Sequence, residues 1–436
     1  MKKIKVAFYT LGCKLNFTET DTIINKFLIK GYEYVKYISF AEIYIINTCS
    51  VTNNAEKKLK KLVKIALKNN VNAFIVAIGC YSQVNPKKIS LINGIDLIIG
   101  ANKKFKIINY LENLSKKKTA KIYYSDIKKS DLYFPSYSKL NRTRSFLKIQ
   151  DGCDSKCSYC TIPKARGTSK SDEITNIIKY AKNVLKKGIK EIVLTGVNIG
   201  YFGKNLKPKS NFLELMKAMD SFFSEKTIIR IRISSIEPNL LNDDIINFIL
   251  KSKIFVHHFH IPLQSGSDEI LNKMKRRYSS NCFSNKIIQI KNLLPNACIG
   301  SDVIVGFPGE QEKNFIETYL FLSKLDISYF HVFSYSERIN TEAIYMKNSI
   351  PQTIRYNRSK ILRILSKRKK YNFYYKNINK KQKVLFEKTN KSGYIYGYTD
   401  NFIRTKTTWK SFLINQIKKV TLLNIDYLGN MICQIH

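Results

Sequence analysis

The sequence predicts an α/β protein built in three parts. These are a parallel-sheet α/β domain over residues 1–120, a partial (β/α)6 barrel over 140–370 and a small β-barrel over 377–436. Short β-rich runs alternate with helical segments through the first two parts, which is typical of βαβ units. After about residue 377 the helical segments stop, and short β-like runs separated by turn residues follow. The length of 436 residues also suits several domains, because one domain spans about 100–200 residues.

Each predicted element of the first part follows from its residue pattern. The runs KVAFYTLG, EIYIINT, AFIVAIG and DLIIG predict strands. Helical spacing marks the segments TDTIINKFLIKGY, AEKKLKKLVKIALKNN and KKFKIINYLENL. A polar, lysine-rich stretch around 116–140 predicts a linker.

The second and third parts follow the same reasoning. Strand-like runs recur at SFLKIQ, EIVLTGVN, IIRIRISS, HHFHIPLQ, CIGSDVIVGF and ISYFHVFSYS, with helical segments between them. Six β/α units predict a small barrel, complete or partial. The runs KVLFEKT, GYIYGYT, NFIRTKTT and QIKKVTLLNIDY predict the final small barrel.

Composition excludes several classes of protein. Hydrophobic residues make up 44% and charged residues 25%, which suits globular domains with apolar cores. The apolar run after the first lysines is too short and polar for a signal peptide, and no stretch approaches the roughly 20 apolar residues of a membrane span. We therefore expect a cytoplasmic protein without a membrane partner. In that compartment nine cysteines indicate thiols or metal thiolates.

The net charge of +43 raises the question of a nucleic-acid partner. The 62 lysines against 13 arginines are also what an AT-rich genome produces by codon drift. Local distribution is more informative, since residues 343–386 contain thirteen Lys or Arg, no acidic residue and several interleaved aromatics. Phosphates attract cations and bases stack on aromatic rings, so this segment favours nucleic acid over a merely solvated helix.

Three cysteines far apart in the sequence each follow a predicted strand. Cys13, Cys49 and Cys80 come after the first, second and third β-runs. The carboxyl ends of parallel strands share one edge of a sheet, where ligands bind. The alternative is three buried cysteines acting as small apolar residues. Polar neighbours at each position favour a metal site.

Three further cysteines lie within eight residues, in DGCDSKCSYCTIPKARG. Cys153, Cys157 and Cys160 have the spacing C-x3-C-x2-C, and no fourth ligand follows. A structural zinc site needs four protein ligands. A [4Fe–4S] cluster held by three thiolates keeps one iron open for a small chelating molecule. The loop follows the first barrel strand, at the end where barrel chemistry gathers.

This loop resembles that of the radical S-adenosylmethionine superfamily. TLGCKLN, INTCSVTN and GCYSQ, together with LTGVN, SSIEP, HIPLQSGSD and DVIVGFPGE, are similar to the motifs of its methylthiotransferases. The final segment resembles a TRAM domain, an RNA-binding β-barrel. Within the family, TLGCKLN, INTCSVTN and YTDN look most like the bacterial branch acting on N6-threonylcarbamoyladenosine in tRNA. The segment SYSERINTEA departs from the family, which more often carries Pro and Gly there.

The resemblance implies the cofactors and partners. Cys153, Cys157 and Cys160 would hold the [4Fe–4S] cluster that cleaves S-adenosylmethionine, and Cys13, Cys49 and Cys80 would hold an auxiliary [4Fe–4S] cluster. A methylthio group would then replace hydrogen at C2 of the adenine at position 37, next to the anticodon. The substrate would be tRNA, with an electron donor such as flavodoxin or ferredoxin and a separate sulfur source. No side-chain acid or base is assigned to catalysis.

The resemblance also suggests residues that contact S-adenosylmethionine. Strand-end motifs and the cysteine loop supply these candidates, which are Tyr159, Gly196, Asn198, Ser234, Glu237, Gln264, Ile304 and Gly306. Each has an alternative role as an ordinary turn or strand-end residue. Arg166 follows the cysteine loop, and it could face substrate or phosphate or form a structural ion pair.

Other functions stay open at this point. Within the family, the substrate could be isopentenyladenosine in tRNA or an aspartate of a ribosomal protein. A protein of another class, binding RNA with two structural zinc sites and no catalysis, fits less well. Two groups of three cysteines would leave each zinc without a fourth ligand.

Overall fold

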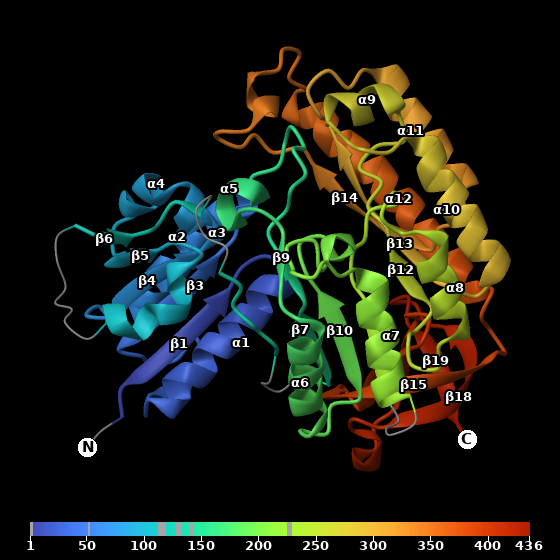
Figure 1. Ribbon diagram of the computed structural model, residues 1–436, viewed down its shortest axis with the longest axis horizontal. Coiled ribbons are helices and arrows are strands. Elements are labelled where there is room, and N and C mark those ends of the chain that lie inside the picture. Colours follow the sequence, from blue (N-terminus) through green and yellow to red (C-terminus); the bar gives the residue numbers. More distant parts are fainter. Residues whose placement is uncertain (1–2, 51–52, 112–118, 128–131, 139–142, 225–228) are drawn as a thin grey trace.

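The computed structural model describes residues 3–50, 53–111, 119–127, 132–138, 143–224 and 229–436. Its first part is a six-stranded, wholly parallel sheet in the order β2-β1-β3-β4-β5-β6 (Figure 1). The elements are β1 (Lys5–Thr10), α1 (Lys14–Ile29), β2 (Glu33–Val35), β3 (Ile43–Thr48), α2 (Asn53–Asn69), β4 (Phe74–Gly79), α3 (Cys80–Val84), α4 (Pro86–Ser90), β5 (Leu97–Ile99), η1 (Lys103–Tyr110) and β6 (Lys121–Tyr123).

The strands of this sheet are apolar on both faces. Consecutive residues such as Val6 and Ala7 point to opposite sides of the sheet and enter two different apolar cores. Ile45 and Ile46 divide between the two cores in the same way. A parallel sheet covered by helices on both faces has this continuous apolar pattern, as the sequence predicts.

One part of the predicted linker is a strand. β6 pairs in parallel with β5 and closes the edge of the sheet. The ring of Tyr123 packs on Tyr110 with centroids 4.6 Å apart. Three residues are too few to show alternation among so many lysines, so the sequence pattern hides this strand. Residues 116–118, 128–131 and 139–140 of the predicted linker lie outside the described residues.

The central part is the partial (β/α)6 barrel that the sequence predicts. Two parallel three-stranded sheets, β7-β10-β11 and β12-β13-β14, are joined by a bridge between Ser235 and His260. Its elements are β7 (Arg144–Lys148), β8 (Gln150–Asp151), α5 (Ile162–Arg166), β9 (Lys170–Ser171), α6 (Ile174–Leu185), β10 (Glu191–Thr195), η3 (Ile199–Tyr201), α7 (Phe212–Phe223), β11 (Arg230–Ile233), α8 (Asp243–Lys251), β12 (His258–His260), α9 (Asp268–Lys273), α10 (Ser280–Leu293), β13 (Cys298–Val305), α11 (Glu312–Lys324), β14 (Tyr329–Ser334), η4 (Glu342–Tyr345) and α12 (Gln352–Tyr375).

The chain ends in a closed five-stranded barrel, ordered β15-β16-β17-β19-β18. Its elements are β15 (Lys381–Lys391), β16 (Tyr394–Thr399), β17 (Arg404–Thr408), η5 (Ser411–Leu413), β18 (Ile417–Ile425) and β19 (Met431–Ile435). This barrel packs against the amino-terminal ends of the central strands. Arg230 binds the Asp400 carboxylate at 2.6 Å, and Arg232 donates to the Asp400 carbonyl at 3.0 Å. The YTDN motif therefore has a structural task, which is to attach this barrel to the base of the central one.

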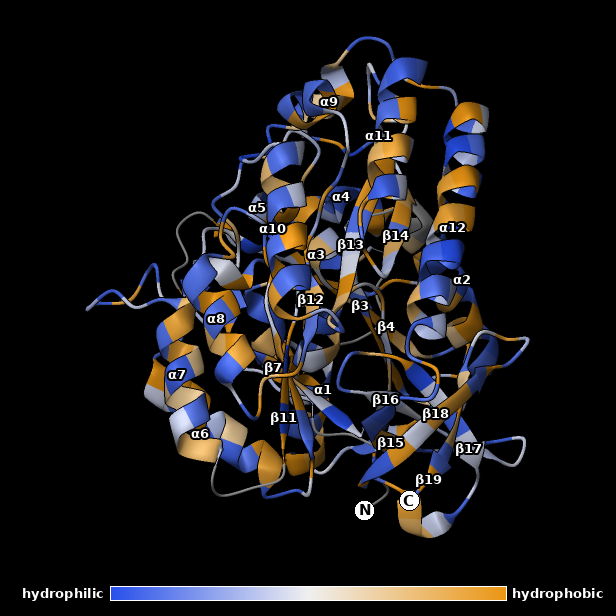
Figure 2. Cartoon of the chain, turned by 90° about the vertical axis from the view of Figure 1, so that its right-hand side faces the viewer, coloured by the Kyte–Doolittle hydropathy of each residue, from blue (hydrophilic) through white to orange (hydrophobic). Residues whose placement is uncertain are grey.

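The basic and aromatic segment forms the long helix α12. The helix packs along β14, beside α11, and carries bands of hydrophilic residues along its length (Figure 2). Arg355 and Arg358 are buried in ion pairs with Glu337 and Glu310, at 2.6 and 2.8 Å. The other cations of α12 stay exposed, apart from the half-buried Lys369. Among the described residues, no helix is long and apolar enough to cross a membrane.

Candidate metal and cofactor site

The structure brings the three N-terminal cysteines to one edge of the parallel sheet. Cys13 follows β1, Cys49 follows β3 directly, and Cys80 opens α3 after β4, and these three strands are neighbours. Gly12 lets the first two loops approach, because a Cβ atom at this position would lie 2.9 Å from the Cys49 sulfur. Its φ of +100° is also one that glycine favours. Cys80 is buried, Cys49 half-buried and Cys13 exposed.

The second cysteine triad lies on the loop after β8, at the carboxyl end of the barrel strands. Each sulfur accepts a hydrogen bond from nitrogen. The Ser155 amide donates to Cys153 at 3.4 Å, and the Ile162 amide donates to Cys160 at 3.4 Å. The Arg276 guanidinium donates to Cys157 at 3.1 Å. N–H groups aimed at sulfur stabilise thiolate and tune the potential of a bound cluster.

The two triads lie next to each other across the boundary between the parallel sheet and the barrel. Ser50 follows Cys49 and Thr161 follows Cys160, and the two hydroxyl oxygens are 3.1 Å apart. The short helices α3 and α5 that follow the cysteine loops pack against each other. One substrate placed between the loops could therefore reach both sites.

Neither triad is arranged around a single metal ion. Across the described part of the chain, no three His, Cys, Asp or Glu side chains converge closely enough to hold one. A structural zinc site requires that convergence. In a [4Fe–4S] cluster each thiolate caps a different iron, so three sulfurs can stand further apart.

Burial makes three of these six thiols weaker acids. Burial, with smaller contributions from the neighbouring Cys157 and Cys153, raises the pKa of Cys160 to about 12, although the hydrogen bond from the Ile162 amide opposes it. Burial also raises the pKa of Cys153 and of Cys80. The nearby Arg166 and Lys104 oppose this effect at Cys80. Such thiols become thiolates when a metal replaces the proton.

Two of the predicted cofactor residues carry buried polar atoms that no described residue satisfies. The amide oxygen and nitrogen of Asn198 have no hydrogen-bond partner, and neither does the Ser234 hydroxyl. Both residues follow barrel strands, β10 and β11, at the end that carries the cysteine loop. Buried polar groups in proteins are nearly always paired. These orphaned atoms therefore fit a polar ligand at the barrel mouth.

Other predicted residues line a cavity of about 250 Å³ beside the cysteine loop. Tyr159, Gln264 and Ile304 form part of its wall, together with Asp302. The divergent segment SYSERINTEA supplies Ser334, Tyr335, Ser336 and Arg338 to the same wall. An apolar wall with a few polar groups is typical of a nucleoside or nucleobase site.

Three predicted residues have structural partners instead. Glu237 is ion-paired with Arg276 at 2.8 Å. Gly196 lies against Gln150, where a Cβ atom would meet the amide oxygen at 2.8 Å. Gly306 lies against Arg355, where a Cβ atom would be 2.2 Å from the side chain. Close packing accounts for both glycines, and Gly306 is absent from the cavity wall.

Sequence reasoning missed several residues at the site. Arg276 bridges Cys157 to Glu237, but it lies on a loop after α9 with no strand before it. Inside the barrel, His260 on β12 contacts Asp302 on β13 at 3.0 Å. The alternation of side chains along β13 could have indicated Asp302, because Asp302 and the predicted Ile304 are two residues apart and share one face of the strand.

Arg166 has a structural role. Its guanidinium is buried and pairs with Glu19 and Asp151, both at 2.9 Å. Its other nitrogen donates to the Asn16 amide oxygen at 2.7 Å. The structure thus selects the ion pair over contact with substrate phosphate.

Comparison with known proteins identifies the family. Residues 147–322 match the model of the radical SAM superfamily, and residues 5–100 match the uncharacterized protein family UPF0004. The chain is 36% identical over 433 residues to the threonylcarbamoyladenosine tRNA methylthiotransferase MtaB of Bacillus subtilis (strain 168), covering 98% of this chain and 95% of that one. The protein belongs to the methylthiotransferase family. It is a radical SAM enzyme.

Further relatives of this methylthiotransferase agree. The protein of the same name from Aquifex aeolicus (strain VF5) is 36% identical, covering 92% of this chain and 96% of that one. A tRNA-2-methylthio-N(6)-dimethylallyladenosine synthase of Clostridium tetani (strain Massachusetts / E88) is 31% identical, covering 96% and 94%. Among solved structures, the radical S-adenosylmethionine methyltransferase TsrM of Kitasatospora setae shares the fold, with a TM-score of 0.56 and 10% identity over 79% of this chain and 77% of that one.

Proposed function

We propose that this methylthiotransferase acts on tRNA and adds a methylthio group to C2 of N6-threonylcarbamoyladenosine at position 37. The near-full-length similarity to proteins named for that substrate carries this proposal. The dimethylallyladenosine synthases match at lower identity. A tRNA substrate also implies that the enzyme works in the cytoplasm.

We assign one cluster to each cysteine triad. Cys153, Cys157 and Cys160 hold the cluster that binds S-adenosylmethionine, and Cys13, Cys49 and Cys80 hold the auxiliary one. Free thiols in both triads and three nitrogen donors to the second triad support this assignment. Bound clusters and S-adenosylmethionine would supply the radical chemistry that an unactivated C2–H bond requires.

The chain itself binds, orients and shields the reactants. Asn198 and Ser234 offer hydrogen bonds that orient the polar end of S-adenosylmethionine. Tyr159, Ile304 and Gln264 form the wall against which a planar base can lie. The Arg276 guanidinium donates to both the Cys157 sulfur and the Glu237 carboxylate, and so fixes the position of Cys157. The buried side chains of Tyr335 and Arg338 in the same wall limit the access of water to reactive groups.

RNA binding is assigned to α12 and the C-terminal barrel. Tyr371 and Tyr375 on α12 are exposed and their rings stack on each other with centroids 6.3 Å apart. Exposed lysines and arginines surround them, which gives the combination of cations and aromatic rings that binds single-stranded nucleic acid. An electron donor such as flavodoxin or ferredoxin and a sulfur source complete the expected partners.

The test is mass analysis of tRNA nucleosides from cells with and without the gene. We expect 2-methylthio-N6-threonylcarbamoyladenosine to disappear on deletion and to return on complementation. Unchanged levels of that nucleoside, with loss of a methylthio group elsewhere, would contradict the proposal. Methylthio-isopentenyladenosine and methylthio-aspartate in ribosomal protein are measured in the same samples.

A further inference from the structure

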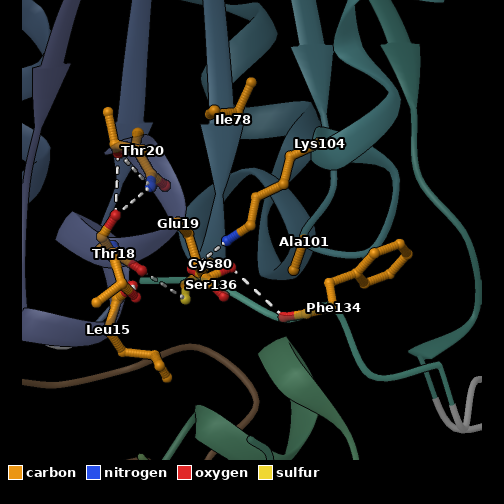
Figure 3. Close-up of polar contacts among 12 residues, drawn as sticks. Leu15, Thr18, Glu19, Thr20, Ile78, Cys80, Ala101, Lys104, Phe134 and Ser136 are labelled. Atoms are coloured by element: carbon orange, nitrogen blue, oxygen red, sulfur yellow. Dashed lines mark hydrogen bonds and ion pairs between the residues drawn. The ribbon is translucent and has the colours of Figure 1, made fainter. Parts of the chain in front are cut away.

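Five charged side chains form one buried network between the parallel sheet and the central barrel. Glu19 on α1 lies at its centre and pairs with Lys104 at 2.5 Å, Lys148 at 3.1 Å and Arg166 at 2.9 Å. Asp151 pairs with Lys148 at 2.5 Å and Arg166 at 2.9 Å. Figure 3 shows the Lys104 side chain reaching toward Glu19.

The network holds more positive than negative charge. Three cations, Lys104, Lys148 and Arg166, face the two carboxylates Glu19 and Asp151. Glu19 lies within 3.1 Å of all three cations and Asp151 within 2.9 Å of two of them, which holds both groups as carboxylates. Two carboxylates against three cations leave one excess positive charge. No other described carboxylate pairs with these three cations. A buried charge without a counter-charge is costly, so a further anion is expected nearby.

The excess charge lies beside the N-terminal cysteines. Arg166 donates to the Asn16 amide oxygen at 2.7 Å, and that oxygen lies 3.9 Å from the Cys80 sulfur. Asn16 is fixed in place, because its amide nitrogen donates to the carbonyls of Leu11 and Thr48 at 2.8 and 3.1 Å. The contacts of the network therefore continue through Asn16 to the Cys80 sulfur, which is an anionic ligand when it binds a metal.

We propose that the excess positive charge of this network is the built-in counter-charge of an anionic iron–sulfur group held at Cys80, and that Arg166 and Lys104 make that group easier to reduce. The inference rests on the auxiliary cluster of the proposed function. Neither residue is catalytic: Arg166 and Lys104 act through the cluster as positioning residues. Net charge near a cluster and hydrogen bonds around its sulfurs are what set its reduction potential.

A purely structural network makes a different prediction. The ion pairs of Glu19 also join two parts of the chain, so any substitution that breaks them loosens that junction. The effect of a loosened junction does not depend on whether the substitution removes a positive or a negative charge. The charge account requires loss of a cation and loss of an anion to move the potential in opposite directions.

The test is an electron paramagnetic resonance redox titration of the full-length chain. Cys153, Cys157 and Cys160 are replaced by Ala so that only the auxiliary cluster gives a signal, and iron is counted first in this parent. We expect Arg166→Gln to lower the ratio of reduced to oxidised cluster at a fixed potential at least tenfold, which is about 59 mV for one electron. Glu19→Gln should raise the same ratio. Arg358→Gln removes a buried, doubly paired arginine on α12, away from the N-terminal sheet, and should leave it unchanged.

Each outcome decides the question. Opposite shifts for Arg166→Gln and Glu19→Gln support the proposal, and Arg166→Lys, which keeps the charge, should stay near the parent value. Shifts of the same sign, or none, overturn it. If Arg166→Gln fails to fold by circular dichroism, Lys104→Gln removes the same charge and carries the same test. A folded parent without iron at the N-terminal triad overturns the second cluster of the proposed function instead.

Discussion

At the scale of single residues, the proposed function divides the chemistry between the two cysteine triads. They occupy separate elements and approach each other through neighbouring residues such as Ser50 and Thr161. Their spacing and their positions after predicted strands allowed all six cysteines to be proposed from the sequence. Arg276 could not be proposed, because nothing in the sequence of a loop after α9 indicates that its guanidinium reaches Cys157.

Separate cysteine substitutions should separate the two activities. Cys157→Ala should abolish reductive cleavage of S-adenosylmethionine, because the open-iron cluster loses a ligand. Cys80→Ala should abolish methylthiolation while part of the 5′-deoxyadenosine production survives. Chromatography of reaction products measures both compounds. Equal loss of cleavage in a folded Cys80→Ala protein would contradict the division, and Cys282→Ala is the matched control outside both triads.

The orphaned amide of Asn198 makes a sharper prediction about the cofactor. Asn198→Ala removes two buried polar atoms that no described residue satisfies. Losing hydrogen bonds worth about 1–3 kcal/mol should raise the KM for S-adenosylmethionine roughly 10- to 100-fold. Stability should change little, because no protein partner is lost. Asn281→Ala on the exposed start of α10 serves as the control. A large fall in melting temperature with an unchanged KM would show that Asn198 is structural.

At the scale of elements, the alternation of strand-like and helical segments in the sequence predicted most of the fold. The strands β1, β3 and β4 and the six barrel strands follow their predicted runs, because the apolar residues of each run pack into a core. The strand β6 was missed because it is three residues long and depends on pairing with β5. Aromatic residues in α12 divide between roles: Phe373 and Tyr374 are buried in the core, whereas Tyr371 and Tyr375 are exposed.

The exposed face of α12 should contribute to tRNA affinity through charge. The triple variant Lys360→Gln, Lys367→Gln and Arg368→Gln removes three exposed cations without touching the buried ion pairs. Binding should weaken, and the slope of log affinity against log salt should fall by about one for each lost phosphate contact. Filter binding across a salt series measures this. The control variant Lys186→Gln, Lys187→Gln and Lys217→Gln changes three exposed lysines around α6 and α7, and an equal effect there would argue against a specific α12 surface.

The base of the central barrel should show a defined dependence of stability on pH. Burial raises the pKa of Glu191, but Arg232 and Arg230 outweigh it and lower the value to about 2. A lowered carboxyl pKa stabilises the fold above the unfolded value of about 4.5, and this stabilisation is lost as pH falls toward 2. The shift corresponds to roughly 3 kcal/mol.

Denaturant unfolding of the wild-type and Glu191→Gln chains at pH 6 and pH 2.5 tests this account of the barrel base. The difference between their unfolding free energies should narrow by about 3 kcal/mol at the lower pH. A constant difference would show that Glu191 does not titrate in that window. Glu214→Gln, at an exposed position on α7, should show no such change.

At the scale of the whole molecule, two of the three parts meet at the site and the third lies at the opposite end of the central barrel. The parallel sheet brings its cysteines to the barrel mouth, and the C-terminal barrel is attached at the opposite end through Arg230 and Arg232. The sequence predicted the three parts, since each has its own periodicity. It could not predict their junctions, because the partners of Glu19 and Arg232 are up to 168 positions away along the chain.

The measurement that most directly tests the central claim offers the reduced, reconstituted enzyme two tRNAs. One carries N6-threonylcarbamoyladenosine at position 37 and the other carries N6-isopentenyladenosine. A threonylcarbamoyl group adds a carboxylate, which basic side chains can pair with, whereas an isopentenyl group requires an apolar pocket. The account predicts that the methylthio group appears at C2 of the threonylcarbamoyl form and that the isopentenyl form is turned over at least 100-fold more slowly. Preferential turnover of the isopentenyl form would contradict it.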